Sequence, residues 1–128
     1  MFDAMPAPAL IDIVDYCSAN SCSHYDMARL AAAAGLGAFH RYSDKGWEAF
    51  EQDGWVRDPR GIKLGKNIAC TLSTACNERA LYYQARVDEH PMNELRVMAL
   101  IKLVLKMREA TYMRHVVSEC KAFFEHFL

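Results

Sequence analysis

The sequence predicts a mainly α-helical fold of five or six helices and one two-stranded β-hairpin, with a winged-helix-like N-terminal half followed by long C-terminal helices. Two observations lead to this fold class. Apolar residues recur at intervals of three and four along most of the chain, which is the period of an amphipathic helix. The exception is Asp58-Pro59-Arg60-Gly61, where the residue types favour a tight turn between two strands.

Three helices are predicted before the hairpin. Pro8 can occupy the first turn of a helix over residues 8–20. Ser23 can cap a second helix that starts near His24 and stops at Gly35. Apolar residues at spacings of three and four then predict a third helix that ends at Gly54. Its apolar positions are Phe39, Tyr42, Trp47 and Phe50.

The hairpin is the most specific local feature. Asp58, Pro59 and Gly61 fill positions i, i+1 and i+3 of a type I turn. Two short strands, Gly54–Arg57 and Ile62–Leu64, are expected on either side of it. This arrangement is typical of the wing of a winged helix.

Amphipathic helices follow the hairpin. The first is expected from about Lys66 to Val87. The stretch from Met92 to Met107 is apolar on most of its circumference, so we expect it to be the most buried element, central in the core or covered by a partner. A last apolar stripe runs from Met113 to Phe127, and periodicity does not decide whether residues 91–128 form one helix or two.

Length and composition indicate one globular domain over residues 1–128, with a winged-helix-like part at 8–66 and a helical part at 67–128. Hydrophobic residues make up 52% of the 128-residue chain and charged residues 24%, so a substantial core can form. The net charge of −1 argues against binding of nucleic acid through bulk electrostatics. Any binding to DNA would have to be local.

The N-terminus and the cysteines indicate the compartment. No basic segment and long apolar run of a secretory signal is present at the start. The run from Leu95 to Met107 is too short for a bilayer and contains two lysines. Five cysteines are an odd number, which favours reduced thiols. We therefore expect a cytoplasmic protein without membrane association.

The order of three helices, a hairpin and a further helix is that of a winged helix-turn-helix. Residues 38–52 would approach DNA, and the turn at residues 57–63 would contact its backbone. The candidate nucleic-acid contacts are basic or imidazole side chains: His40, Arg41, Lys45, Arg57, Arg60 and Lys63. Against this interpretation, Arg41 and Asp44 occupy positions where helix-turn-helix families place apolar residues.

The segment Gly61-Ile62-Lys63-Leu64-Gly65-Lys66-Asn67-Ile68 follows a predicted strand and turn and leads into a helix. Together with the rest of residues 50–76, within a winged-helix-like stretch at about 24–76, it resembles the C-terminal winged-helix region of the oxygen-independent coproporphyrinogen III oxidases. The resemblance implies a winged fold. The Cys-x3-Cys-x2-Cys cluster that holds the iron–sulfur centre of that family is absent from this sequence, so the chemistry of the enzyme is not implied.

The sequence does not predict a catalytic site. It contains no evident pairing of a nucleophile with a base, paired carboxylates or phosphate-binding glycine loop, so we expect no enzyme activity and no cofactor. A zinc-dependent module is a minor alternative, because thiolate and imidazole are the ligands that zinc prefers. The residues with those ligands are Cys17, Cys22, His24, Cys70 and Cys76. Cys70 and Cys76 would lie about 240° apart around one helix, which disfavours a shared ion.

The expected function is therefore binding. The first hypothesis is a small winged-helix transcription regulator that binds DNA and dimerises through its C-terminal helices. The second is a protein–protein adaptor or inhibitor, such as those encoded by mobile elements, that occludes a partner protein. In either case a protein partner or a second copy would contact apolar side chains of the last helix. These interface candidates are Val116, Cys120, Phe123, Phe124 and Phe127.

Overall fold

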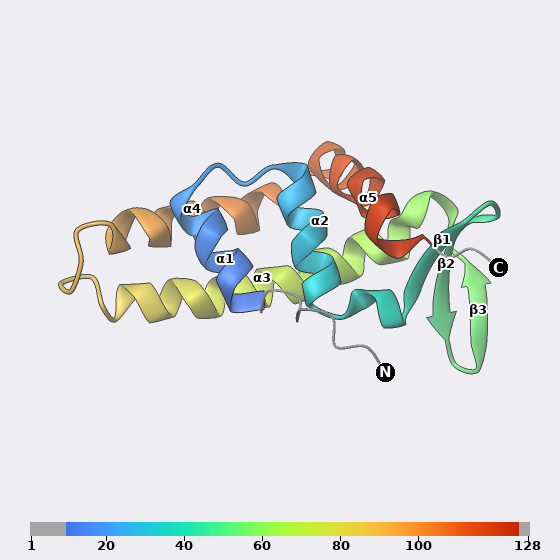
Figure 1. The fold of residues 1–128 in the computed structure, drawn as a ribbon, viewed down its shortest axis with the longest axis horizontal. Helices are drawn as coiled ribbons and strands as arrows, with labels where there is room; N and C mark the ends of the chain where they lie inside the picture. Colours follow the sequence, from blue (N-terminus) through green and yellow to red (C-terminus); the bar gives the residue numbers. More distant parts are fainter. Residues whose placement is uncertain (1–9, 126–128) are drawn as a thin grey trace, which may run out of the picture.

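The computed structural model describes residues 10–125, which form a mainly helical fold with a small antiparallel sheet at one end (Figure 1). The helices of this part are α1 (Leu10–Ala19), α2 (His24–Ala33), α3 (Ile62–Gln84), α4 (Asn93–Lys106) and α5 (Ala110–Phe124). The strands are β1 (His40–Ser43), β2 (Gly46–Glu51) and β3 (Gly54–Arg57), in the order β1-β2-β3. Short 3-10 turns, η1 (Leu36–Ala38) and η2 (Pro59–Gly61), lie on either side of the sheet in the chain.

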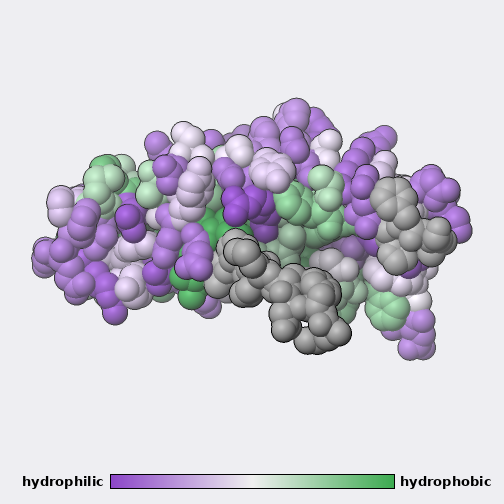
Figure 2. Space-filling view, viewed as in Figure 1, coloured by the Kyte–Doolittle hydropathy of each residue, from purple (hydrophilic) through white to green (hydrophobic). Residues whose placement is uncertain are grey.

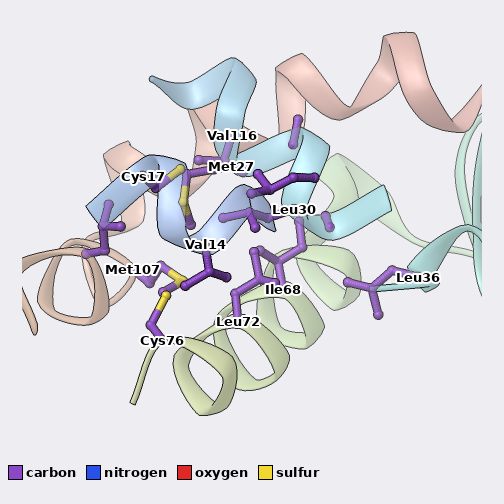
Figure 3. Packing of buried hydrophobic residues seen from close by; sticks show 14 of the residues in the cluster. Val14, Cys17, Met27, Leu30, Leu36, Ile68, Leu72, Cys76, Met107 and Val116 are labelled. Carbon is purple, nitrogen blue, oxygen red and sulfur yellow. The ribbon is translucent and has the colours of Figure 1, made fainter. Parts of the chain in front are cut away.

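Helix α3 is the central element of the core, because it contacts each of the other four helices. It buries one side chain in almost every turn, among them Leu64, Ile68 and Leu72. Figure 3 shows the last two packed beneath side chains of α1 and α2, including Val14 and Leu30. The expectation that the helix after Met92 would be the most buried is therefore wrong.

Helix α2 begins where the sequence predicts. The Ser23 hydroxyl accepts a hydrogen bond from the Asp26 amide at 3.0 Å, and the Asp26 carboxylate accepts one from the Ser23 amide at 3.0 Å. This reciprocal pair satisfies two amides that the first turn of a helix leaves free. Gly35 follows the helix with φ +83°, a left-handed conformation that favours glycine.

The prediction of a helix that ends at Gly54 is wrong, because strands β1 and β2 and the turn between them occupy residues 40–51. The spacing of the aromatic residues is misleading here, since they lie on both faces of a sheet. Tyr42 and Trp47 pack together on the core side, with ring centroids 5.0 Å apart, whereas the side chain of Phe50 is exposed. Gly46, with φ +89°, completes the turn between the strands and prevents a helix there.

The prediction of a two-stranded hairpin is also wrong, because the chain forms a three-stranded sheet. Strand Gly54–Arg57 is confirmed, but it pairs with β2. Residues 62–64 begin α3, because the Asp58 carboxylate accepts hydrogen bonds from the Lys63 and Leu64 amides at 2.9 and 3.1 Å. The turn itself forms, but φ of Arg60 is +61°, which excludes type I.

The predicted winged-helix arrangement is not confirmed in residues 10–125. The helix expected to approach DNA, at residues 38–52, is the β1–β2 hairpin. Residues 91–125 form two helices, which are separated by a break at Met107–Glu109. The part of the predicted last stripe beyond Glu125, including Phe127, lies outside the described residues.

Hydrophilic residues spread over both ends of the face in Figure 2, and apolar surface gathers near its middle. Within residues 10–125, no helix is long and apolar enough to cross a bilayer.

An ion pair joins α1 to α3. Arg79 Nε and Nη2 donate to the two carboxylate oxygens of Asp15 at 2.6 and 2.8 Å. Partial burial alone would raise the pKa of Asp15, but hydrogen bonds from Arg79 and Tyr83 and the charge of Arg79 outweigh it. The pKa of Asp15 is therefore below its usual value.

We expect Arg79→Met to lower the free energy of unfolding by about 1 kcal/mol near neutral pH, given the partial exposure of the pair. Because the pKa of Asp15 is lowered by folding, this contribution is present above an unfolded value of about 4 and is lost as pH falls through the folded value. Urea titrations at about pH 7 and about pH 2 should show the difference shrinking. A difference of the same size at both pH values would contradict the assignment. Arg29→Met, which removes a looser pair with Asp26 at 3.7 Å, is the matched control.

Candidate binding groove

A groove of about 480 Å³ lies between the N-terminal part of α3 and helix α5, next to the break between α4 and α5. Apolar residues and glycines form its floor, and charged residues form its rim. The apolar and glycine residues are Gly61, Ile62, Gly65, Ala69, Met107, Ala110, Met113 and Val117. The charged residues are Arg60, Lys66, Arg108, Glu109 and Arg114.

The turn at residues 58–61 builds one end of the groove. Asp58 is 1% exposed, and its carbonyl accepts a hydrogen bond from the Gly61 amide at 2.9 Å. Its own amide donates to the Trp47 carbonyl at 2.9 Å, which fixes the turn to strand β2. The turn thus carries the exposed Arg60 at the rim while Asp58 caps α3 beneath it.

Close packing at Gly61 holds the two sides of the groove together. A Cβ atom built on Gly61 would lie 2.7 Å from Val117 Cγ1 on α5 and 3.1 Å from Trp47 Cδ1 on β2. The residue also has φ +67°. Glycine therefore allows the start of α3 to approach α5 more closely than any other residue could.

The rim carries an excess of positive charge. Within residues 10–125, none of its four basic residues forms an ion pair, since the ion pairs of this part involve other arginines and Lys63. Arg114 makes one hydrogen bond, from Nη2 to Thr111 Oγ1 at 3.1 Å. An apolar floor beneath four cations and the one anion of Glu109 is suited to a ligand with an apolar face and negative charges.

The outer face of the sheet is a second exposed surface. Arg41 donates to Glu48 at 2.9 Å, and its guanidinium carbon lies 4.2 Å from the ring centroid of Trp55. Trp55 in turn packs edge-on against Phe50 across strands β2 and β3, with centroids 5.4 Å apart. The charge of Arg41 is therefore already paired on this face.

Of the sequence-predicted nucleic-acid contacts, Arg41 and Arg57 lie on one face of the sheet on either side of Glu48, whereas the others lie on different elements. Lys45, Arg57 and Arg60 are exposed, but Arg41 is paired with Glu48, and Lys63 with Glu51 at 2.6 Å. Lys45 lies in the β1–β2 turn, Arg57 on β3 and Arg60 at the rim of the groove.

His40, the sixth predicted contact, is buried against α3. It is 5% exposed, and its Nε2 lies 2.9 Å from the Asn67 amide nitrogen. Which of these two atoms donates depends on the tautomer of the ring, and Nδ1 is buried without a hydrogen-bond partner in the described part of the chain. Burial lowers the pKa of His40, so the ring is neutral and offers no charge to phosphate.

The predicted partner interface on the last helix is largely intramolecular. Val116, Cys120 and Phe124 are buried in the core, where α5 packs on α2. Phe123 is half-buried against Tyr25, with ring centroids 5.2 Å apart. The three buried side chains stabilise the fold and are not exposed to a partner, whereas Phe123 keeps part of its surface exposed.

In the described part of the chain, no three acidic, thiol or imidazole side chains are grouped so that they could hold a metal ion. Cys17 and Cys22 lie close, with sulfurs 2.8 Å apart, and this hydrogen bond raises the pKa of Cys22. Burial raises the pKa of the Cys76 and Cys120 thiols to about 12. Such thiols are poor nucleophiles at neutral pH.

The groove is not predicted by the sequence patterns. Arg108 and Arg114 carry no motif, and they meet Arg60 and Lys66 because α5 packs beside the start of α3. The one usable signal is the cluster of cations around the α4–α5 break, where Lys106, Arg108 and Arg114 lie close together in sequence.

Comparison with protein-family models, curated proteins and solved structures finds no match to this chain.

Proposed function

We propose that this protein is a non-enzymatic protein–protein adaptor that holds an acidic, amphipathic helix of a partner protein in the α3–α5 groove. The observation that carries the proposal is the combination of an apolar floor with four basic residues that form no ion pair within residues 10–125. Apolar side chains of the bound helix would occupy the floor, and flanking Asp or Glu would pair with the rim.

The dimensions of the groove support a short helix as its occupant. On α3 it runs from Ile62 to Ala69, which corresponds to about 10 Å along the helix axis, or about two turns. A partner helix of that length presents two or three anchor residues at positions i, i+3 or i+4, and i+7. Ile62, which is 53% exposed, would lose much of its exposure on binding.

Two observations favour a protein over DNA as the partner. The predicted DNA contacts are buried, paired or distributed over separate elements. The overall charge of −1 also provides no general attraction to phosphate.

We expect an acidic amphipathic peptide of about 15 residues, with leucines at helical spacing and glutamates elsewhere, to bind the wild-type protein. The double variant Arg108→Glu plus Arg114→Glu should weaken binding at least about tenfold, because it replaces attraction with repulsion at the rim. Fluorescence anisotropy of the labelled peptide measures both affinities.

A matched control makes the same change of charge elsewhere. Lys45→Glu plus Arg57→Glu alters one exposed residue in the β1–β2 turn and one on β3, and it should leave the affinity within about twofold. A peptide with the same leucines but with lysines in place of glutamates should fail to bind. Equal losses in the two double variants, or equal binding of the two peptides, would refute the groove as the site.

A further inference from the structure

Two cysteine sulfurs meet where helix α1 joins helix α2. Cys17 lies in the last turn of α1, and Cys22 lies between the helices, directly before Ser23, which caps α2. Both thiols are free, and the Cys22 thiol donates a hydrogen bond to the Cys17 sulfur at 2.8 Å. Carbon atoms, which are smaller than sulfur, pack at about 3.5–4.0 Å, so these two sulfurs are in unusually close contact.

This placement suits a covalent bond between the two sulfurs. The S–S bond of a disulfide is about 2.05 Å long, so the sulfurs need to approach each other by less than about 1 Å. The chain between them, residues 18–21, contains the end of α1 and the start of the α1–α2 connection. The bond would therefore tie the end of one helix to the start of the next.

Access to the pair is one-sided. Cys17 is 2% exposed and belongs to the hydrophobic core cluster (Figure 3), whereas Cys22 is half-buried. An oxidant that arrives from solvent meets Cys22 first, and Cys17 lies behind it as the resolving thiol.

We propose that Cys17 and Cys22 form a redox-modification site, at which a low-molecular-weight disulfide such as oxidised glutathione converts the two thiols into an intramolecular disulfide. The Cys22 thiolate attacks one sulfur of oxidised glutathione, which forms a mixed disulfide and releases a glutathione thiolate. The Cys17 thiolate then attacks Cys22 Sγ, which closes the protein disulfide and releases the second glutathione thiolate. The two protein thiols are oxidised, their protons pass to the leaving thiolates, and one glutathione disulfide is reduced to two thiols.

The proposal does not depend on the function proposed for the α3–α5 groove. A cross-link of this kind stabilises a fold chiefly by restricting the unfolded chain. We therefore expect the oxidised protein to unfold at a higher urea concentration than the reduced protein.

Equilibration of the full-length protein with mixtures of reduced and oxidised glutathione tests the proposal. The hydrogen bond to Cys17 raises the pKa of Cys22 and slows the first attack, so each mixture is followed until its composition is constant. After the free thiols are blocked with a maleimide, trypsin releases residues 1–29, which contain Cys17 and Cys22 and no other cysteine. In oxidising mixtures we expect this peptide to lose two hydrogen atoms and to carry no maleimide.

A second tryptic peptide, residues 67–79, is a matched control in the same sample. It contains Cys70 and Cys76, six residues apart, but Cys70 is exposed on α3 whereas Cys76 is fully buried. This peptide should show no internal disulfide in the native protein. The wild-type chain in concentrated urea is the other control. The native pair of Cys17 and Cys22 should be half oxidised in a mixture at least about tenfold more reducing than the unfolded chain requires.

Three outcomes would overturn the proposal. Residues 1–29 could keep two free thiols in oxidised glutathione, they could carry glutathione instead of an internal disulfide, or the native and unfolded chains could pair at the same glutathione ratio. Cys22→Ser tests the order of attack, because the buried Cys17 should then stay reduced. Uptake of glutathione by Cys17 in this variant would contradict its role as the resolving thiol.

Discussion

Asp58→Ala is expected to lower the free energy of unfolding by about 3 kcal/mol, because it removes the acceptor for two amides at the start of α3. The carboxylate binds the Lys63 and Leu64 amides at 2.9 and 3.1 Å, and the residue is 1% exposed. Little water can replace the lost acceptor, so at least one buried amide would be unsatisfied. Urea denaturation followed by circular dichroism measures the change.

Two further variants separate the cap from a general effect of charge. Asp58→Asn keeps one oxygen acceptor and should cost roughly half as much as alanine. Asp53→Ala removes an exposed aspartate from the β2–β3 turn and should change the free energy of unfolding by less than about 0.5 kcal/mol. If Asp58→Ala were as mild as Asp53→Ala, the carboxylate could not be the main cap of α3.

Asp58 also explains why the sequence predicts the turn but not its context. Asp, Pro and Gly at these spacings indicate a tight turn, and Gly61 does close one onto the Asp58 carbonyl. The same Asp side chain is an equally good helix cap, and the sequence does not say which elements the turn joins. The choice depends on packing of Gly61 against Val117, a residue far away in the chain.

The helical elements are easier to predict than the sheet. The capping residues of α2 and the stripe of α3 are local signals, and both predict the elements that form. The β1–β2 hairpin has no unbroken alternation of apolar and polar residues, because Phe50 is exposed on its outer face, where it packs against the half-buried Trp55 of β3. Aromatic residues on both faces of a strand imitate helical spacing.

The exposed surfaces depend on information that periodicity does not contain. The sequence identifies α4 as mostly apolar, but the exposure of part of its surface follows from α3 occupying the centre of the core. The groove requires Arg60 and Arg114 to meet across two helices that are distant in sequence. Sequence patterns identify which residues are apolar or charged, and only the tertiary contacts decide which of them share a surface.

Gly61→Ala is expected to lower the free energy of unfolding by about 3 kcal/mol, from two separate causes. Its φ of +67° lies in the left-handed region, where a Cβ atom costs about 1 kcal/mol. The added methyl group would also lie 2.7 Å from Val117 Cγ1 and 3.1 Å from Trp47 Cδ1, and overpacking of this kind costs about 1–3 kcal/mol. Thermal and urea unfolding of the variant measure the sum.

Gly35→Ala isolates the backbone contribution, because Gly35 has φ +83° but no atom lies within 4 Å of the position that its Cβ would take. It should cost about 1 kcal/mol, so the difference between the two variants gives the cost of the collision. Val117→Ala removes the nearest colliding atom. Combined with Gly61→Ala, it should be less destabilising than the sum of the two single variants. Additive losses, or equal losses at Gly35 and Gly61, would mean that close approach of α5 does not require glycine at residue 61.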